Sequence, residues 1–177
     1  MINGYDKLKQ MYPEFDEESR TPNGIDLQLG KVYEITNKEN KICGLIHGEK
    51  HNAEHIEIPP TIINGIIDVW ELKPHHSYIM EVDRQIQIGE NNVQLYFPRS
   101  TLLRNNIDLR TAVGDAGYFG KLSFLCINHN DYPFYITKGE RFAQLVDFEL
   151  KDNSILYNGD YQENPDEEWD TSNRIQF

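Results

Sequence analysis

The stretch of sequence that decides the fold runs from Phe97 to Leu150 and reads FPRSTLLRNNIDLRTAVGDAGYFGKLSFLCINHNDYPFYITKGERFAQLVDFEL. Apolar residues recur in it at every second position, at Leu122, Phe124 and Cys126 and again at Phe134 and Ile136. A period of two is typical of strands that bury one face. We therefore expect strands here, with polar clusters held between them at fixed offsets.

Three polar clusters interrupt this alternation, and their side chains suit a phosphorylated ligand. The clusters are Pro98–Ser100, Asp115–Gly120 and Gly139–Gln144. Arginines and hydroxyl groups bind phosphate, a carboxylate can hold a water, and an aromatic ring can pack against a sugar or a base. The stretch therefore predicts a cradle for a phosphorylated ligand.

Outside this stretch the chain keeps a pattern of short strands. Strands are expected at residues 25–35, 56–58, 62–70, 78–82, 85–88 and 93–97, a short helix within residues 1–12, and a single helical turn at 102–106. Residues 36–55 are polar and predict a loop or an irregular hairpin. Many short strands between turn signals are typical of a sandwich, barrel or jelly roll, so the predicted fold class is all-β.

A chain of 177 residues is most simply one domain with a core of its own. We expect that domain to span residues 1–150, followed by an acidic C-terminal tail over residues 151–177. The segment Asp160–Asp170 holds six acids and no base. Two interpretations of the tail stay open. It is either a solvated terminus or a flap over a bound ligand, covered by Tyr161 or Trp169.

Charge and composition exclude several classes of function. A net charge of −12 argues against a nucleic-acid polymer as partner, although a local arginine cluster can still hold a small anion. No run approaches the roughly 18 apolar residues of a membrane span, and no secretory signal is evident. The two cysteines, Cys43 and Cys126, lack metal spacing, so a reduced cytoplasmic setting is expected and zinc deaminase chemistry is not.

One metal motif occurs in the sequence without its expected context. His51-Asn52-Ala53-Glu54-His55 matches the H-x-x-E-H pattern of a zinc protease. That chemistry needs a helix, which places both histidines on one face. The residues that follow, Ile56–Pro60, predict a strand and a break, so no zinc site is expected.

Four segments in order resemble the motifs of the trimeric dUTP diphosphatase and dCTP deaminase superfamily. They are Thr21–Leu27, Pro98–Leu102, Asp115–Gly120 and Lys138–Leu145. Each segment alone is a weak signal, but the four occur in order with compatible spacing over most of the chain. The resemblance implies a distorted jelly-roll β-barrel that forms a homotrimer with sites at the subunit interfaces.

The resemblance also implies an activity, the hydrolysis of dUTP to dUMP and diphosphate. In this reaction, the resemblance makes Asp115 the general base that holds the water attacking the α-phosphorus. The Tyr118 ring packs on the deoxyribose and leaves no room for a 2′-hydroxyl, while the loop from Thr111 to Gly120 reads uracil with backbone groups. Without the other motifs, Asp115 reads as a turn-capping residue before Gly117 and Tyr118 as an ordinary strand aromatic.

The remaining expected site residues bind the triphosphate. They are Arg99, Ser100, Arg104, Arg141 and Gln144. Arg104 is expected to reach the site of a neighbouring subunit, and a simple ion pair is the alternative for Arg141. Asp26 is expected to support a water on Mg²⁺, which the triphosphate itself carries, or else only to fix its strand.

The resemblance to the deaminase branch breaks at Leu125. This residue stands where that branch needs a glutamate to move protons at the cytosine ring. A leucine side chain can neither accept nor donate a proton. The next glutamate along the chain is Glu140, in the turn before the fourth motif.

The flanks, Gln28–Gly30 and Leu72–Ile88 among them, still resemble deaminases, and the Gly-rich arm of the diphosphatases is absent. A dCTP deaminase, alone or bifunctional, and a non-catalytic nucleotide-binding regulator therefore stay open as alternatives.

Overall fold

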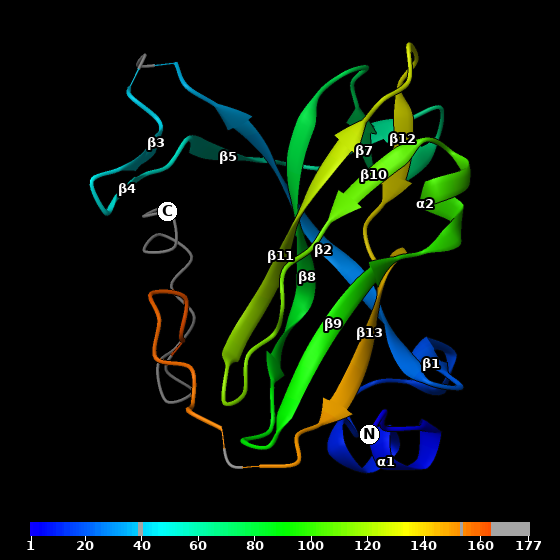
Figure 1. Ribbon diagram of the computed structural model, residues 1–177. Coiled ribbons are helices and arrows are strands. Elements are labelled where there is room, and N and C mark those ends of the chain that lie inside the picture. The colour runs from blue at the N-terminus through cyan, green and yellow to red at the C-terminus, as the bar shows by residue number, and fades with distance from the viewer. Residues whose placement is uncertain (39–40, 153, 164–177) are drawn as a thin grey trace.

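The structure is a computed structural model that describes residues 1–38, 41–152 and 154–163 (Figure 1). Its helices are α1 (Tyr5–Met11), the 3-10 helix η1 (Glu17–Ser19) and α2 (Ser100–Arg104). Its strands are β1 (Arg20–Thr21), β2 (Gly24–Thr36), β3 (Gly44–Ile46), β4 (Glu49–His51), β5 (Glu54–Ile58), β6 (Thr61–Ile63), β7 (Ile66–Leu72), β8 (Ser77–Gln87), β9 (Asn92–Pro98), β10 (Ile107–Arg110), β11 (Phe119–Asn128), β12 (Phe134–Thr137) and β13 (Arg141–Glu149). No helix in these residues is long and apolar enough to cross a membrane.

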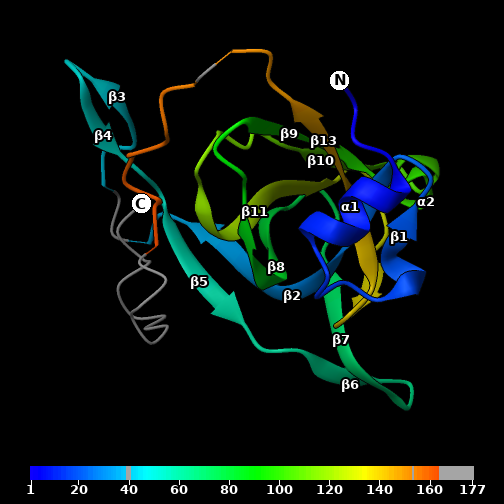
Figure 2. The same ribbon diagram turned by 90° about the horizontal axis from the view of Figure 1, so that it is seen from below.

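The main sheet is antiparallel and nearly closes into a barrel. Its strands follow the order β10-β11-β8-β2-β13-β9, and β1 and β5 pair with β2. The two ends meet where Gln94 of β9 and Gly114, after β10, exchange two backbone hydrogen bonds of 2.9 Å. Figure 2 shows these strands arranged around a ring. The predicted all-β class and the barrel are confirmed.

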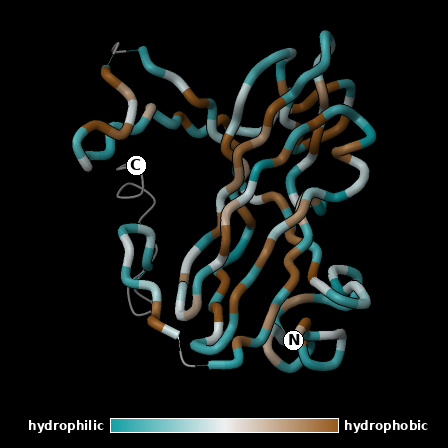
Figure 3. The backbone as a smooth tube through the Cα atoms, in the orientation of Figure 1, coloured by the Kyte–Doolittle hydropathy of each residue, from teal (hydrophilic) through white to brown (hydrophobic). Residues whose placement is uncertain are grey.

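Strand β11 shows how the period-two pattern builds the core. Leu122, Phe124 and Cys126 are buried, whereas the alternate residues face outward. The Phe124 ring packs against Tyr96 and Phe142, with ring centroids 5.1 and 5.9 Å apart. Burying one such side chain stabilises the fold by about 1.5–3 kcal/mol. Along the strands, Figure 3 shows hydrophobic residues alternating with hydrophilic ones.

The structure corrects the expected strands at two places. The single strand expected at 62–70 is wrong, because β6 and β7 are separate strands joined by a turn at Asn64-Gly65, which have φ of 52° and 81°. Asn-Gly is the sequence signature of such a tight turn. The segments 78–82 and 85–88 are one strand, β8, and the helical turn spans Ser100–Arg104 rather than 102–106.

Residues 36–55 include the β3–β4 hairpin, which projects from the barrel (Figures 1 and 2). The irregular hairpin expected there is confirmed. His51 lies in β4 and His55 lies in β5, so the H-x-x-E-H motif is not on a helix. The geometry that a zinc protease needs is therefore not formed.

Candidate active site

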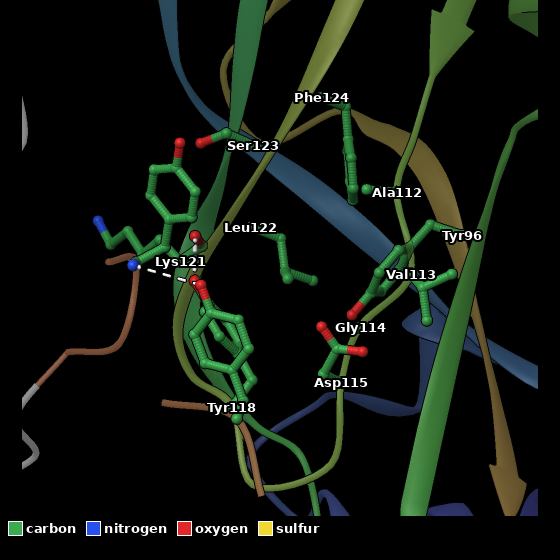
Figure 4. Close-up of a pocket in the computed structure, with 12 residues that line it drawn as sticks. Tyr96, Ala112, Val113, Gly114, Asp115, Tyr118, Lys121, Leu122, Ser123 and Phe124 are labelled. Atoms are coloured by element: carbon green, nitrogen blue, oxygen red, sulfur yellow. Dashed lines mark hydrogen bonds between the residues drawn. The ribbon is translucent and has the colours of Figure 1, made fainter. Parts of the chain in front are cut away.

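A cavity of about 440 Å³ lies beside the turn between β10 and β11. Its walls are the loop Ala112–Asp115, Tyr118, the β11 residues Lys121–Phe124, Tyr96 of β9, and Tyr157 and Tyr161 of the tail (Figure 4). The predicted uracil loop and two predicted site residues, Asp115 and Tyr118, therefore meet in one cavity.

Asp115 presents its carboxylate to this cavity (Figure 4). The turn it belongs to is held by the backbone, since the Tyr118 amide donates to the Asp115 carbonyl at 3.1 Å. In the part of the chain that the structure describes, no hydrogen bond or ion pair engages the Asp115 carboxylate. The side chain does not cap the turn, and the carboxylate faces a space that a ligand can enter.

Tyr118 is held rigidly against the cavity wall. Its hydroxyl donates to the Lys121 carbonyl at 3.0 Å, and its ring meets Tyr157 edge-on with 5.5 Å between centroids. Gly120 has φ of 156°, and a Cβ there would lie 2.6 Å from the Tyr118 hydroxyl. The position of the ring thus depends on a glycine two residues later, which explains the aromatic-x-Gly spacing of the third motif.

The described part of the tail, up to Glu163, folds back onto the same turn. The Tyr157 amide donates to the Ala116 carbonyl at 2.8 Å, and the Glu163 amide donates to the Phe119 carbonyl at 3.0 Å. The Lys121 amide in turn donates to Glu163 Oε1 at 2.9 Å. The tail thereby brings Tyr157 and Tyr161 into the cavity wall, whereas the expectation for Trp169 lies outside the described residues.

Two of the predicted phosphate-binding arginines surround Asp26, a buried carboxylate on β2. Arg99 Nη1 donates to Asp26 Oδ2, and Arg141 Nη1 lies 3.8 Å from the same oxygen. Arg141 also donates to the Glu18 carbonyl at 2.6 Å. Burial and then the charge of Arg141 lower the pKa of Arg99 from its usual value. Two cations share the Asp26 carboxylate here, and a second carboxylate, Glu140, lines the same cavity. The charges balance, so what the cluster offers an anion is the N–H donors of two guanidinium groups.

The arginine cluster opens into a second cavity of about 390 Å³, which also contacts β7 and β12. The two cavities have no lining residue in common. Gln144 lies near this cluster and donates to Thr21 Oγ1 at 2.6 Å. Ser100 and Arg104 are exposed at the two ends of α2. Within one chain, the predicted phosphate ligands are therefore separated from Asp115 and Tyr118.

Leu125 faces outward on β11, between Ile79 of β8 and Arg110 of β10. It does not line the cavity. One acid that the sequence pattern did not reveal lies on the same face, because Glu81 of β8 pairs with Ser123. Its Oε1 is 3.7 Å from the Lys121 ammonium. The next glutamate along the chain, Glu140, therefore gave no indication of Glu81, which only the pairing of β8 with β11 brings to this face.

Several cavity residues were missed from the sequence, namely Tyr96, Lys121, Ser123 and Tyr157. Lys121 and Ser123 directly follow the third motif, and Tyr96 lies two residues before the second motif. That proximity was the only signal for them. Tyr157 is far along the chain, and only the fold-back of the tail brings it to the site.

Comparisons with known proteins agree with this fold. Residues 5–150 match the family model described as dCTP deaminase-like. The chain therefore belongs to the dCTP deaminase-like family. A protein from Methanothermobacter thermautotrophicus named "Probable deoxyuridine 5'-triphosphate nucleotidohydrolase" is 41% identical over 92% of this chain and 100% of its own length.

A second relative, from Methanocaldococcus jannaschii, is named "Deoxyuridine 5'-triphosphate nucleotidohydrolase". It is 32% identical over 92% of this chain and 99% of its own length. Among solved structures, the 2'-deoxycytidine 5'-triphosphate deaminase from Agrobacterium tumefaciens superposes with a TM-score of 0.57 at 16% identity. The match covers 82% of this chain and 47% of that one, and it shows the shared fold.

Proposed function

We propose that this protein hydrolyses dUTP to dUMP and diphosphate. The observation that carries the proposal is the Asp115 carboxylate, which faces a cavity beside the buried Tyr118 ring and has no hydrogen-bond or ion-pair partner among the described residues. The two relatives named for this activity, which align over more than nine-tenths of the chain, support it.

In the proposed reaction, Asp115 accepts a proton from the water that attacks the α-phosphorus. A positioned general base of this kind contributes about 10²- to 10⁴-fold in rate. The Tyr118 ring packs on the deoxyribose, and the backbone of the loop Ala112–Asp115 reads the uracil edge. Paired backbone contacts of this kind reject cytosine, because its donors and acceptors are exchanged relative to uracil.

The proposed phosphate ligands are the side chains of Arg99, Ser100, Arg104, Arg141 and Gln144. Each arginine offers a charged fork that matches phosphate oxygens. In the cluster around Asp26, the phosphate oxygens of a triphosphate would accept hydrogen bonds from the two guanidinium groups. The site is therefore suited to the anionic half of the substrate.

We also propose that the substrate arrives as its Mg²⁺ complex. The described residues contain no group of three or more His, Cys, Asp or Glu side chains that could hold an ion by themselves. We therefore propose that the magnesium is held mainly by phosphate oxygens and waters, and that the Asp26 carboxylate supports one of those waters. When bound, the ion neutralises charge on the leaving diphosphate.

The separation of the two cavities favours a site shared between subunits, in which one subunit supplies Asp115 and a neighbour supplies the arginines. We propose that the assembly is a homotrimer. We propose that residues 1–150 form the barrel of each subunit and residues 151–177 a tail that covers its cavity. A cytoplasmic location agrees with the two free cysteines, Cys43 and Cys126.

The proposed function is tested by supplying dUTP and dCTP separately with Mg²⁺ and separating the products. We expect dUMP and diphosphate from dUTP, and neither dUTP nor dUMP from dCTP at a comparable rate. The reason is that Leu125 cannot move protons at the cytosine ring. Accumulation of dUTP or dUMP from dCTP would overturn this assignment, and Glu81, on the same face of the sheet, is then the acid to substitute next.

The role of the tail is tested by two truncations. A chain that ends at Leu150 loses Tyr157, Tyr161 and Glu163, and we expect its KM for dUTP to rise about tenfold, since aromatic walls leave the cavity. A chain that ends at Glu163 keeps these contacts and serves as the matched control. Unchanged kinetics in the shorter chain would show that the tail is a passive terminus.

A further inference from the structure

Tyr96 connects the cavity to a buried chain of hydrogen bonds. Its side chain comes from β9, is 4% exposed and lines the cavity beside Asp115 (Figure 4). A Cβ on Gly114 would overlap the Tyr96 hydroxyl, so that hydroxyl lies against the backbone just before Asp115. Tyr96 therefore meets the cavity with its polar end.

Three hydrogen bonds connect the Tyr96 hydroxyl to Asp147 of β13, whose carboxylate is fully buried. The Tyr96 hydroxyl donates to Gln94 Oε1 at 2.7 Å. Gln94 Nε2 donates to the Tyr12 hydroxyl at 2.6 Å, and the Tyr12 hydroxyl donates to Asp147 Oδ2 at 3.0 Å. Every donor in this chain points away from the cavity.

The donor-to-acceptor direction of these three hydrogen bonds is fixed at Asp147, where the series ends. The amides of Asn3 and Asn92 donate to Asp147 Oδ1 at 2.6 and 2.7 Å, so this carboxylate is met by donors. Gln94 Nε2 lies 3.5 Å from Asp147 Oδ2. If the Gln94 amide were reversed, two acceptor oxygens would face each other there. Gln94 must therefore turn its own oxygen toward Tyr96.

The consequence is that Tyr96 offers the cavity an acceptor and no donor. Its hydrogen is engaged by Gln94, which leaves only lone pairs on the oxygen for a ligand. Burial raises the pKa of the Tyr96 hydroxyl above its usual value, so the proton stays in place. The neighbouring Asp115 carboxylate is an acceptor as well, so the cavity wall places two acceptors next to each other.

We infer that the Tyr96 oxygen binds an O–H donor jointly with the Asp115 carboxylate. The inference rests on the proposed function, because a deoxynucleoside triphosphate brings two such donors to the site, the sugar 3′-hydroxyl and the attacking water. A water donates one hydrogen to each of the two acceptors, whereas the 3′-hydroxyl shares its single hydrogen between them, and either group is thereby fixed in orientation. Tyr96 is thereby a binding residue for the reaction, oriented through Gln94, Tyr12 and Asp147.

The test is Tyr96→Phe, which keeps the ring and removes the acceptor. Its kcat/KM for dUTP is expected to fall about three- to tenfold, the contribution of one neutral hydrogen bond. Tyr78→Phe is the matched control, because Tyr78 is also buried and its hydroxyl accepts from the Lys73 amide at 2.8 Å, outside the cavity. The control is expected to keep wild-type kinetics, and thermal unfolding of both variants reports whether the fold is kept.

The triphosphate of 2′,3′-dideoxyuridine separates the two donors, because it lacks the 3′-hydroxyl. If Tyr96 binds that hydroxyl, the wild type and Tyr96→Phe become equal on this substrate. If Tyr96 binds the water, the loss persists and appears in kcat. Either result supports the acceptor role. Wild-type kinetics of Tyr96→Phe on dUTP, or an equal loss in Tyr78→Phe, would overturn it.

A failure of the proposed function remains distinguishable from a failure of this inference. If the wild-type protein does not hydrolyse dUTP, the sugar hydroxyl is the donor left to test. Calorimetry with the non-hydrolysable α,β-imido analogue of dUTP then compares affinities directly. Weaker binding by Tyr96→Phe than by Tyr78→Phe supports the inference, and equal affinities overturn it.

Discussion

Asp115→Asn is expected to lower the turnover of dUTP about 10²- to 10⁴-fold, the usual contribution of a positioned general base. The amide of asparagine has the shape of the carboxylate but cannot accept the proton of the attacking water. The turn itself should survive, because its Tyr118–Asp115 hydrogen bond uses only the backbone. Nucleotide affinity is therefore expected to change far less than turnover.

The measurement is steady-state kinetics of dUMP formation together with calorimetric binding of a non-hydrolysable dUTP analogue. Asp131→Asn is the control, because Asp131 lies in the exposed loop after β11 and contacts His75, away from both cavities. Asp131→Asn changes the net charge of the protein by the same amount as Asp115→Asn. A near-normal turnover of Asp115→Asn would exclude this carboxylate from the mechanism.

The parts of the site that sequence alone predicted are those that depend on neighbours along the chain. The Asp115–Gly120 turn, for example, holds the proposed base and the aromatic ring within four residues, and both line one cavity in the structure. Alternation predicted the buried face of β11 for the same reason. Patterns of this kind can be predicted because the geometry of a single strand determines which of its residues share a face.

The parts that could not be predicted depend on pairing between distant strands. Strand β8 was split in the prediction at Asp83 and Arg84, two polar residues in the middle of a strand. They are tolerated because they bond each other, and because the Arg84 guanidinium lies 4.6 Å from the Phe15 ring centroid. The position of Glu81 opposite Ser123 likewise follows from a strand register that alternation does not determine.

Arg99→Ala is expected to lower kcat/KM for dUTP about 10- to 100-fold, the contribution of a charge-assisted hydrogen bond to phosphate. Among the described residues, it also leaves the buried Asp26 carboxylate with Arg141 as its one remaining cation, 3.8 Å away, so the free energy of unfolding should fall as well. Arg110→Ala is the control, because it removes an arginine whose partner, Asp108, lies on the same strand and outside both cavities. Equal kinetics of the two variants would remove Arg99 from the phosphate site.

Mixing the Asp115→Asn and Arg99→Ala subunits tests whether one chain can form the complete site. The two residues lie at cavities with no common lining residue, so the proposed trimer must bring Asp115 of one subunit to Arg99 of another. If the two kinds of subunit assemble at random, about a quarter of the interfaces join two intact halves, and activity returns to about that fraction of the wild type. Light scattering on the same sample reports whether trimers are present. If trimers form but the mixture is no more active than the two variants measured separately, Asp115 and Arg99 act within one subunit, and the shared site is wrong.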